Sequence, residues 1–377
     1  MEYRKLGRTG LDVSAISLGT EYLMEPSPEE VMGVIHEALD RGINYFDLFW
    51  PQPWFRDKMG AAFAGRRHEA LLAAHLGAVM YNNQSGVSRD PVLAERFFHE
   101  FLTRYDTDYV DLLYLHNCDQ QEDYEALMRM DGLLGQALQY KAQGKARFLA
   151  FSGHTVSTAL QAVQSGHIDV LMFPINLVGN AVPGKRELLQ TCAAHEVGIV
   201  AMKPYAGGKL LQPNQVMAME SWQVGGSAIE LRRAATITPV QCMAYVLSQI
   251  GISTVVPGCK NVDELSQALA YWDADEQARD FTLPLAGFQQ AIRGDCVYCN
   301  HCLPCPAEID IGATMRLIDQ ARIAGAGTIH TPELRAAYAA LGHNANDCLQ
   351  CGDCEERCPF GVQVIERMEQ GVELFAG

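Results

Sequence analysis

Positive charge is scarce in this chain of 377 residues, in which Lys and Arg total 29 against 45 Asp and Glu, for a formal net charge of −16. Nucleic acids and anionic membrane surfaces are bound through clustered positive charge, so the composition argues against both as partners. Apolar runs are short, and none approaches the roughly 18 residues that a membrane-spanning helix needs. The first residues, MEYRKLGRTG, also lack the basic and apolar regions of a signal peptide. We therefore expect a cytoplasmic protein.

Cysteine is sparse through most of the chain. Only Cys118, Cys192, Cys242 and Cys259 precede residue 296, and we expect them to be buried apolar residues. The other eight lie close together near the C-terminus, at Cys296, Cys299, Cys302, Cys305, Cys348, Cys351, Cys354 and Cys358. Disulfides are rare in the cytoplasm, which argues against a disulfide framework for these eight.

Short apolar runs alternate with longer amphipathic stretches over the first 280 residues or so. The runs predict strands at residues 15–19, 44–48, 70–75, 109–116, 146–152, 169–173, 198–203 and 253–257. The amphipathic stretches predict helices at residues 28–41, 54–65, 91–105, 124–143, 155–165, 185–196, 239–250 and 262–272. Eight strand–helix repeats predict an α/β fold, a closed (β/α)8 TIM barrel. A doubly wound open sheet is the alternative, weakened because no GxGxxG follows the first strand.

The composition changes after this region. We predict a barrel over residues 1–283 and a small helical domain over residues 284–377, with helices at 311–324, 332–341 and 361–374. The long stretch at 205–238 shows no periodicity, and we expect a loop on the catalytic face of the barrel.

The eight C-terminal cysteines form two groups with regular spacing. The second group, CLQCGDCEERCP, has the C-x2-C-x2-C-x3-C-P spacing of bacterial [4Fe–4S] sites, and the first, CVYCNHCLPCP, is one residue tighter. In two-cluster proteins the fourth cysteine of each run binds the other cluster. We therefore predict one [4Fe–4S] cluster on Cys296, Cys299, Cys302 and Cys358, and a second on Cys348, Cys351, Cys354 and Cys305. Two zinc sites, each with four cysteine ligands, are the alternative.

Six short segments follow one another along the chain in the order that the comparison below requires. They are MEYRKLGRTGLDVSAISLGT, GINYFD, DTDYVDLLYLHN, FSGH, GIVAMKPYAGGKLL and VVPGCKNVDEL. Together they resemble the aldo-keto reductases, and with the C-terminal cysteines they resemble the subgroup of that family with a ferredoxin-like iron–sulfur domain. The resemblance implies a TIM barrel with its active site at the C-terminal ends of the strands. It also implies carbonyl reduction with NADPH as hydride donor.

The resemblance implies a catalytic tetrad of Asp, Tyr, Lys and His, with Tyr as the general acid. Asp47 and His116 match the Asp and the His, whereas Gln52 stands at the position of the Tyr and His75 at that of the Lys. An imidazole titrates near pH 6.5, so we predict that His75, held by Asp47, is the acid. His116 and Gln52 would then orient the substrate. A packed polar role for His75 is the alternative.

The positions at which the family holds its nicotinamide cofactor also differ. Ser152-Gly153, Met172 and Met202 stand where the resemblance implies Ser-Asn, Gln and an aromatic residue. The loop after the eighth strand keeps its outline as PGCK, but Glu264 replaces a positive group on the next helix, which disfavours a 2′-phosphate. The residues left to bind a cofactor or another phosphate-bearing ligand are Ser152, Lys203, Gly258 and Lys260.

Three functions remain open from the sequence. The first is an oxidoreductase whose barrel binds a small organic substrate and whose two clusters relay electrons. The second is an NAD(P)H-dependent carbonyl reductase with structural or sensing clusters. The third is an electron-transfer or scaffold subunit with a degenerate barrel site. For the first, the acidic surface predicts docking of a redox partner protein with a basic or mixed surface.

Overall fold

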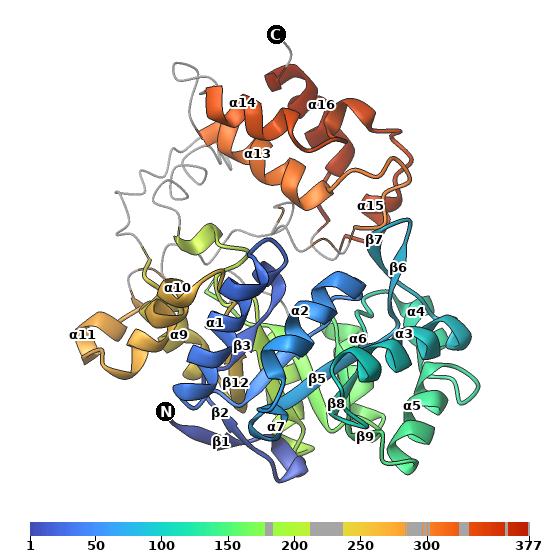
Figure 1. Ribbon diagram of the computed structural model, residues 1–377, viewed down its shortest axis with the longest axis vertical. Coiled ribbons are helices and arrows are strands. Elements are labelled where there is room, and N and C mark those ends of the chain that lie inside the picture. The colour runs from blue at the N-terminus through green and yellow to red at the C-terminus, as the bar shows by residue number, and fades with distance from the viewer. Residues whose placement is uncertain are drawn as a thin grey trace.

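The computed structural model describes residues 1–177, 184–211, 237–282, 284, 296, 300, 302–323, 332–358 and 361–375. Eight parallel strands form one sheet in which each strand pairs with its neighbour in the chain order of the barrel (Figure 1). They are β3 (Leu18–Gly19), β4 (Tyr45–Leu48), β5 (Leu71–Leu76), β8 (Val110–Leu115), β9 (Ala146–Ser152), β10 (Val170–Pro174), β11 (Gly198–Met202) and β12 (Ile252–Val256). Isolated bridges from Ile16 to Val255 and from Gly19 to Gly258 join the two edges of the sheet. The predicted TIM barrel is confirmed, and the doubly wound alternative is wrong.

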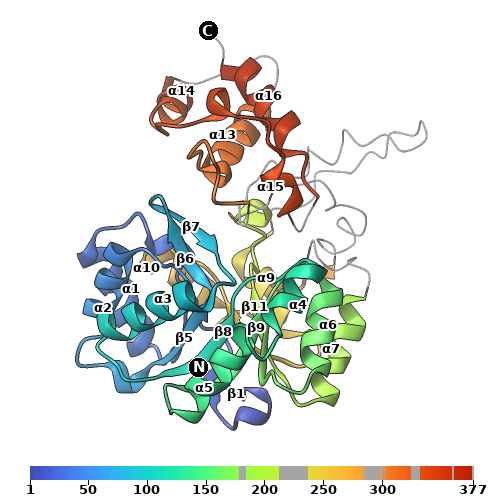
Figure 2. The ribbon, with the colours of Figure 1, turned by 90° about the vertical axis from the view of Figure 1, so that its right-hand side faces the viewer.

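Amphipathic helices surround the sheet, as Figures 1 and 2 show. They are α1 (Pro28–Asp40), α2 (Pro53–Phe63), α3 (Pro91–Arg104), α4 (Gln121–Leu127), α5 (Leu133–Ala142), α6 (Val156–Gln164), α7 (Lys185–Ala194), α9 (Pro239–Leu247), α10 (Val262–Leu269) and α11 (Glu276–Arg279). Helix α1 begins at a capping box in which Ser27 and Glu30 bond each other's backbone N–H, at 3.2 and 2.8 Å. Its stripe of Val31, Val34 and Ile35 is buried in the core.

Helix α4 and helix α5 correct the single helix expected over residues 124–143. A turn separates them, in which Gly132 N–H donates to the Arg129 carbonyl at 3.0 Å. At Gly135 a side chain would lie 1.8 Å from the Met130 carbonyl oxygen, so the chain needs glycine there to pass so close. The helical periodicity continues through the turn, which explains why the sequence pattern did not reveal the break.

Two antiparallel hairpins were not expected. The first, β1 (Tyr3–Lys5) and β2 (Asp12–Ser14), precedes the barrel. The second, β6 (Ala78–Tyr81) and β7 (Gln84–Val87), directly follows β5 and turns at Asn82 and Asn83, both with positive φ. Figure 1 shows the second hairpin rising from the barrel toward α15 (Asp353–Glu356).

The C-terminal helices are α13 (Ile311–Ile323), α14 (Pro332–Ala339), α15 and α16 (Val364–Phe375). They share a buried cluster of their own that includes Met315, Ile318 and Met368. The expected helical C-terminal fold is confirmed, while the exact division at residue 283 stays a prediction. In both views this region lies above one end of the barrel (Figures 1 and 2). Among the described residues, no helix is long and apolar enough to cross a membrane.

Candidate active site

A cavity of about 340 Å³ opens at the C-terminal end of the barrel strands. Each of the eight strands contributes a lining residue within two positions of its C-terminal end, in the order Gly19, Asp47, His75, His116, Ser152, Met172, Met202 and Val256. In TIM barrels this end is where the loops gather side chains for chemistry. This cavity therefore lies where the site is expected.

Asp47, His75 and His116 form a continuous hydrogen-bonded chain along one side of the cavity. The Asp47 Oδ1 atom lies 2.8 Å from His75 Nε2, and His75 Nδ1 lies 2.9 Å from His116 Nδ1. Because a carboxylate can only accept, His75 donates from Nε2 to Asp47. A neutral His75 then accepts at Nδ1 from the Nδ1–H of His116, which leaves His116 Nε2 outside the chain.

Burial and aromatic packing hold these rings in place. The side chains of His75 and Asp47 are 3% and 9% exposed. His75 stacks on Tyr114 with 4.7 Å between ring centroids, and Phe49 packs against both histidines. Burial, with the nearby His75, Arg89 and His154, holds the pKa of His116 well below its ordinary value of 6.5. His116 is therefore neutral around pH 7.

Arg89 fixes the loop that carries His116. Its guanidinium donates to the carbonyl oxygens of His116 at 2.8 Å and Asn117 at 2.7 Å, and it pairs with Asp123 at 2.7 Å. Asn117 has a φ of 41°, a left-handed conformation that Asn tolerates better than most residues. Its backbone N–H donates to Ser152 Oγ at 2.9 Å. Together these hydrogen bonds hold Asn117 in its strained left-handed conformation just after β8, as is common at functional sites.

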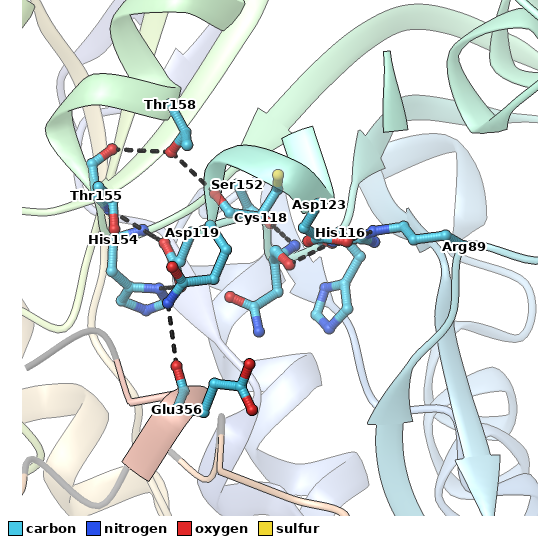
Figure 3. Close-up of polar contacts among 12 residues, drawn as sticks. Arg89, His116, Cys118, Asp119, Asp123, Ser152, His154, Thr155, Thr158 and Glu356 are labelled. Atoms are coloured by element: carbon cyan, nitrogen blue, oxygen red, sulfur yellow. Dashed lines mark hydrogen bonds and ion pairs between the residues drawn. The ribbon is translucent and has the colours of Figure 1, made fainter. Parts of the chain in front are cut away.

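A second Asp–His pair lies on the same loop system and was missed by the sequence reasoning. Asp119 Oδ2 lies 3.0 Å from His154 Nδ1, and His154 lines the cavity. Figure 3 shows His116 on one side of the loop and Asp119 with His154 on the other. Both residues occur in the segments HNCD and FSGH, so their places just after the fourth and fifth strands were the available signal.

The four residues expected to bind a cofactor all line the cavity: Ser152, Lys203, Gly258 and Lys260. Two neighbouring side chains, those of Glu264 and Tyr22, restrict access to Lys260 and Gly258. The Glu264 carboxylate accepts the backbone N–H of Lys260 at 2.8 Å, and the Tyr22 ring lies where a side chain on residue 258 would stand, at 2.5 Å. A carboxylate therefore already fills the anion position at the start of α10.

The C-terminal helices contribute one lining residue to the barrel cavity. Arg316 of α13 lies with its guanidinium carbon 5.7 Å from the centre of the Tyr22 ring. Burial raises the pKa of Glu21, on the facing loop, while Lys203 and Arg316 lower it. Asp319, one turn further along α13, pairs with Lys209 at 3.7 Å. The cavity wall thus combines residues from both parts of the chain, which the sequence pattern could not reveal.

Gln52 is not brought to the cavity with the other expected catalytic residues. It precedes α2, where its carbonyl accepts the N–H groups of Phe55 at 3.1 Å and Arg56 at 3.0 Å. Its side chain is buried, and Oε1 has no hydrogen-bond partner among the described residues. Unlike Asp47 and His75, it does not line the cavity.

The second predicted cluster site is supported by a common cavity. Cys305, Cys348, Cys351 and Cys354 all line one small cavity of the C-terminal region, although Cys305 is more than 40 positions away in the chain; Cys302, predicted for the first cluster, lines it too. Burial, Glu355, Cys348 and Cys351 raise the pKa of the Cys354 thiol to about 11, which reflects the crowding of these groups. These four cysteines fit a [4Fe–4S] cluster, in which each iron binds one thiolate.

The first predicted site is described only in part, since Cys299 lies outside the described residues. Cys296, Cys302 and Cys358 pack against the same buried cluster. Arg357 donates to the carbonyl oxygens of Cys302 at 3.1 Å and Pro304 at 2.8 Å, which ties the segment of Cys358 to the loop of Cys302. This contact agrees with the predicted exchange of the fourth cysteines.

Single-ion sites are not found in the part of the chain that the structure describes. No three of its His, Cys, Asp or Glu side chains stand close enough together to bind one metal ion.

Comparison with known proteins agrees with this geometry. The sequence model of the Aldo/keto reductase family matches residues 15–282, and that of a 4Fe-4S dicluster domain matches residues 295–363. The chain belongs to the aldo/keto reductase family. The expected resemblance, to reductases of this family with an iron–sulfur domain, is confirmed, and this aldo/keto reductase is accordingly an oxidoreductase.

Its relatives are similar along most of their lengths. An uncharacterized oxidoreductase, YqkF, from Bacillus subtilis is 26% identical over 71% of this chain and 90% of its own. L-galactose dehydrogenase from Arabidopsis thaliana is 24% identical over 72% of this chain and 88% of its own. The solved aldo-keto reductase AKR11C1 from Bacillus halodurans shares the fold with a TM-score of 0.61 and 20% identity, over 76% of this chain and 96% of its own.

Proposed function

We propose that this aldo/keto reductase interconverts a small carbonyl compound and its alcohol, with electrons exchanged one at a time through the C-terminal domain. The proposal depends on one observation above all, the chain from Asp47 through His75 to His116 at the wall of the cavity. This chain moves a proton without a Tyr or a Lys. It occupies the positions at which the family resemblance implies the Asp, the Lys and the His, whereas Gln52 stands at the position of the Tyr.

The proton-transfer chemistry follows from the two hydrogen bonds. When His116 Nε2 takes up a proton, its Nδ1 proton can pass to His75 Nδ1. The positive charge then rests on His75, against the Asp47 carboxylate at 2.8 Å. In reverse, the chain delivers a proton from His116 to the oxygen of a carbonyl in the cavity. His75 therefore acts as a relay, because both of its nitrogens are used inside the chain, and His116 is the proposed group at the substrate.

The case against hydride transfer rests on the cofactor positions. Glu264 fills the anion position at Lys260, and Tyr22 covers Gly258. Met172 and Met202 line the wall where the resemblance implies an amide and an aromatic ring. A thioether neither donates the hydrogen bond that orients a nicotinamide amide nor stacks as a flat ring does. Lys203, Lys260 and Arg316 instead favour an anionic group on the substrate.

Two [4Fe–4S] clusters are proposed for the C-terminal domain, one on Cys296, Cys299, Cys302 and Cys358, the other on Cys348, Cys351, Cys354 and Cys305. When bound, such clusters accept and donate single electrons. The protein's own contribution is to hold the domain at the mouth of the cavity. Cys305 N–H donates to Gln84 Oε1 of the β6–β7 hairpin at 3.2 Å, and Asp319 pairs with Lys209.

Metal analysis and a titration of anaerobically purified protein test this proposal. We expect about eight iron and eight sulfide per chain, as two [4Fe–4S] clusters require. We also expect reduced methyl viologen to bleach the visible absorption, and NADH and NADPH neither to bleach it nor to bind with enhanced fluorescence. Two zinc per chain without sulfide would contradict the cluster assignment. Tight binding of NADPH with turnover would favour an ordinary nicotinamide-dependent reductase.

A further inference from the structure

Asp119 fixes the orientation and the protonation pattern of His154. Its Oδ1 accepts the backbone N–H of Thr155 at 3.1 Å and also that of His154. These two hydrogen bonds fix the carboxylate beside the His154 ring. Its Oδ2 lies 3.0 Å from His154 Nδ1. The side chains of His154 and Asp119 are 1% and 7% exposed. The buried carboxylate accepts, so His154 carries its proton on Nδ1 when the ring is neutral.

His154 and His116 act on the same cavity. Both line it, and His154 is close enough to lower the pKa of His116. The titratable and charged groups that act on His154 in turn are Asp119 and Lys203; burial lowers its pKa, and Asp119 opposes that effect. An imidazolium here is thus a ready proton donor, with its positive charge compensated by Asp119.

The number of proton donors distinguishes two ways of reducing a double bond. Hydride transfer brings hydrogen to the carbon, so one acid is enough for the oxygen. Reduction by single electrons brings no hydrogen, so both atoms of the bond need protons. The cavity has two Asp–His units, one ending at His116 and one at His154.

We propose that His154, oriented by Asp119, is a second acid–base residue of this cavity and delivers the second proton of a two-electron reduction. The inference rests on the proposed function. The π bond of a C=O group breaks, two electrons arrive from a one-electron donor, and two protons complete the CH–OH product. Each histidine first takes up a proton from solvent on Nε2; His116 then supplies the proton that forms the O–H bond, and His154 supplies the one that forms the C–H bond.

The loop of Asp119 also touches the domain that carries the cysteines. The side chain of Gln120 donates from Nε2 to the carbonyl oxygen of Glu356 at 3.1 Å. Glu356 lies between Cys354 and Cys358, and Figure 3 shows it approaching the loop beneath Asp119 and His154. His154 would thus deliver its proton beside the segment proposed to bind both clusters, whereas His116 lies on the other side of the loop (Figure 3).

The orientation of His154 can be tested without any substrate. In protein labelled with 15N-histidine, NMR of the ring nitrogens should reveal two neutral histidines protonated on Nδ1, the tautomer that is less common in water, one from His116 and one from His154. The signal of His154 should vanish in His154→Gln and shift toward the Nε2–H form in Asp119→Asn, while that of His116 remains. The matched control, His167→Gln, changes an exposed histidine and should leave the signal unchanged. A His154 protonated on Nε2 in the wild type would overturn the inference.

The catalytic role is tested with dithionite-reduced methyl viologen as donor and a panel of aldehydes and ketones as acceptors. On a compound that the wild type reduces, His154→Gln should lower kcat at least about 100-fold, the usual contribution of a general acid, with KM changed much less. Asp119→Asn should lower kcat about tenfold, because His154 remains but loses its orienting carboxylate. His167→Gln should match the wild type.

The outcomes separate the inference from the proposed function. Viologen-driven turnover in the wild type that persists within twofold in His154→Gln would overturn the inference and leave the proposed function standing. Turnover of the wild type with NADPH and none with viologen would overturn the proposed function and the second-proton role together. Normal circular dichroism spectra and melting temperatures for both variants exclude misfolding as the cause of a loss.

Discussion

One buried histidine, His75, and one partly buried histidine, His116, on the same wall of the barrel carry the proposed chemistry at the scale of single residues. His75 is held between Asp47 and His116, and only His116 remains to meet a substrate. The family resemblance implied Asp47 and His116 as site residues and placed His75 at the position of the Lys. From the sequence we predicted His75 as the acid; our proposal gives that role to His116, with His75 as relay. That order depends on distances across three strands, which spacing along one chain does not contain.

The lowered pKa of His116 predicts how stability depends on pH. Because its folded pKa lies well below 6.5, the unfolded chain binds the proton first as the pH falls. The stabilisation is complete above about pH 6.5 and is lost as the pH falls toward the folded pKa, at about 1.4 kcal/mol per pH unit for one proton. His116→Gln should flatten the decline of melting temperature between pH 6.5 and 5, and His167→Gln should not. Equal slopes for His116→Gln and the wild type would count against a neutral, partly buried His116.

At the scale of elements, helix α10 and the β6–β7 hairpin show what local sequence does and does not determine. Helix α10 begins at Asn261, whose side chain accepts the N–H of Glu264 at 2.9 Å, and the Glu264 carboxylate folds back onto Lys260. The sequence predicted the unfavourable charge of Glu264 but not this bond. The hairpin carries a recognisable signal, two Asn residues between short alternating runs, yet its contact with Cys305 depends on the distant C-terminal domain.

Replacing Glu264 tests whether this carboxylate excludes phosphate from the start of α10. Glu264→Gln keeps the shape of the side chain and removes the charge, so NADPH binding that is too weak to detect in the wild type should strengthen about tenfold, or about 1.4 kcal/mol, and become measurable. NADH affinity should change less, because NADH lacks the 2′-phosphate. Fluorescence titration of both nucleotides measures the effect, and Asp263→Asn on the same turn is the matched control. An equal change for both nucleotides would show that Glu264 does not select against the phosphate.

At the scale of the whole molecule, the C-terminal domain completes the barrel cavity. Arg316 lines it, Asp319 pairs with Lys209 beside it, and Gln84 and Gln120 bond the backbone near the cysteines. The sequence predicted the two folds and the cysteine groups, because strand periodicity and ligand spacing are local patterns. It did not predict how the two parts meet, since complementary surfaces leave no periodic signal. The contacts fit an enzyme in which electrons and substrate approach from the same face.

The central claim, electron-by-electron reduction in this cavity, predicts where the hydrogen of the product comes from. The direct measurement is mass spectrometry of the alcohol formed from a carbonyl substrate in D2O, with reduced methyl viologen or NADPH as donor. Our account predicts viologen-driven turnover and a product with deuterium bound to carbon, because both protons come from exchangeable side chains of the protein. A product formed only with NADPH, with carbon-bound hydrogen from the nucleotide and no deuterium there, would contradict it.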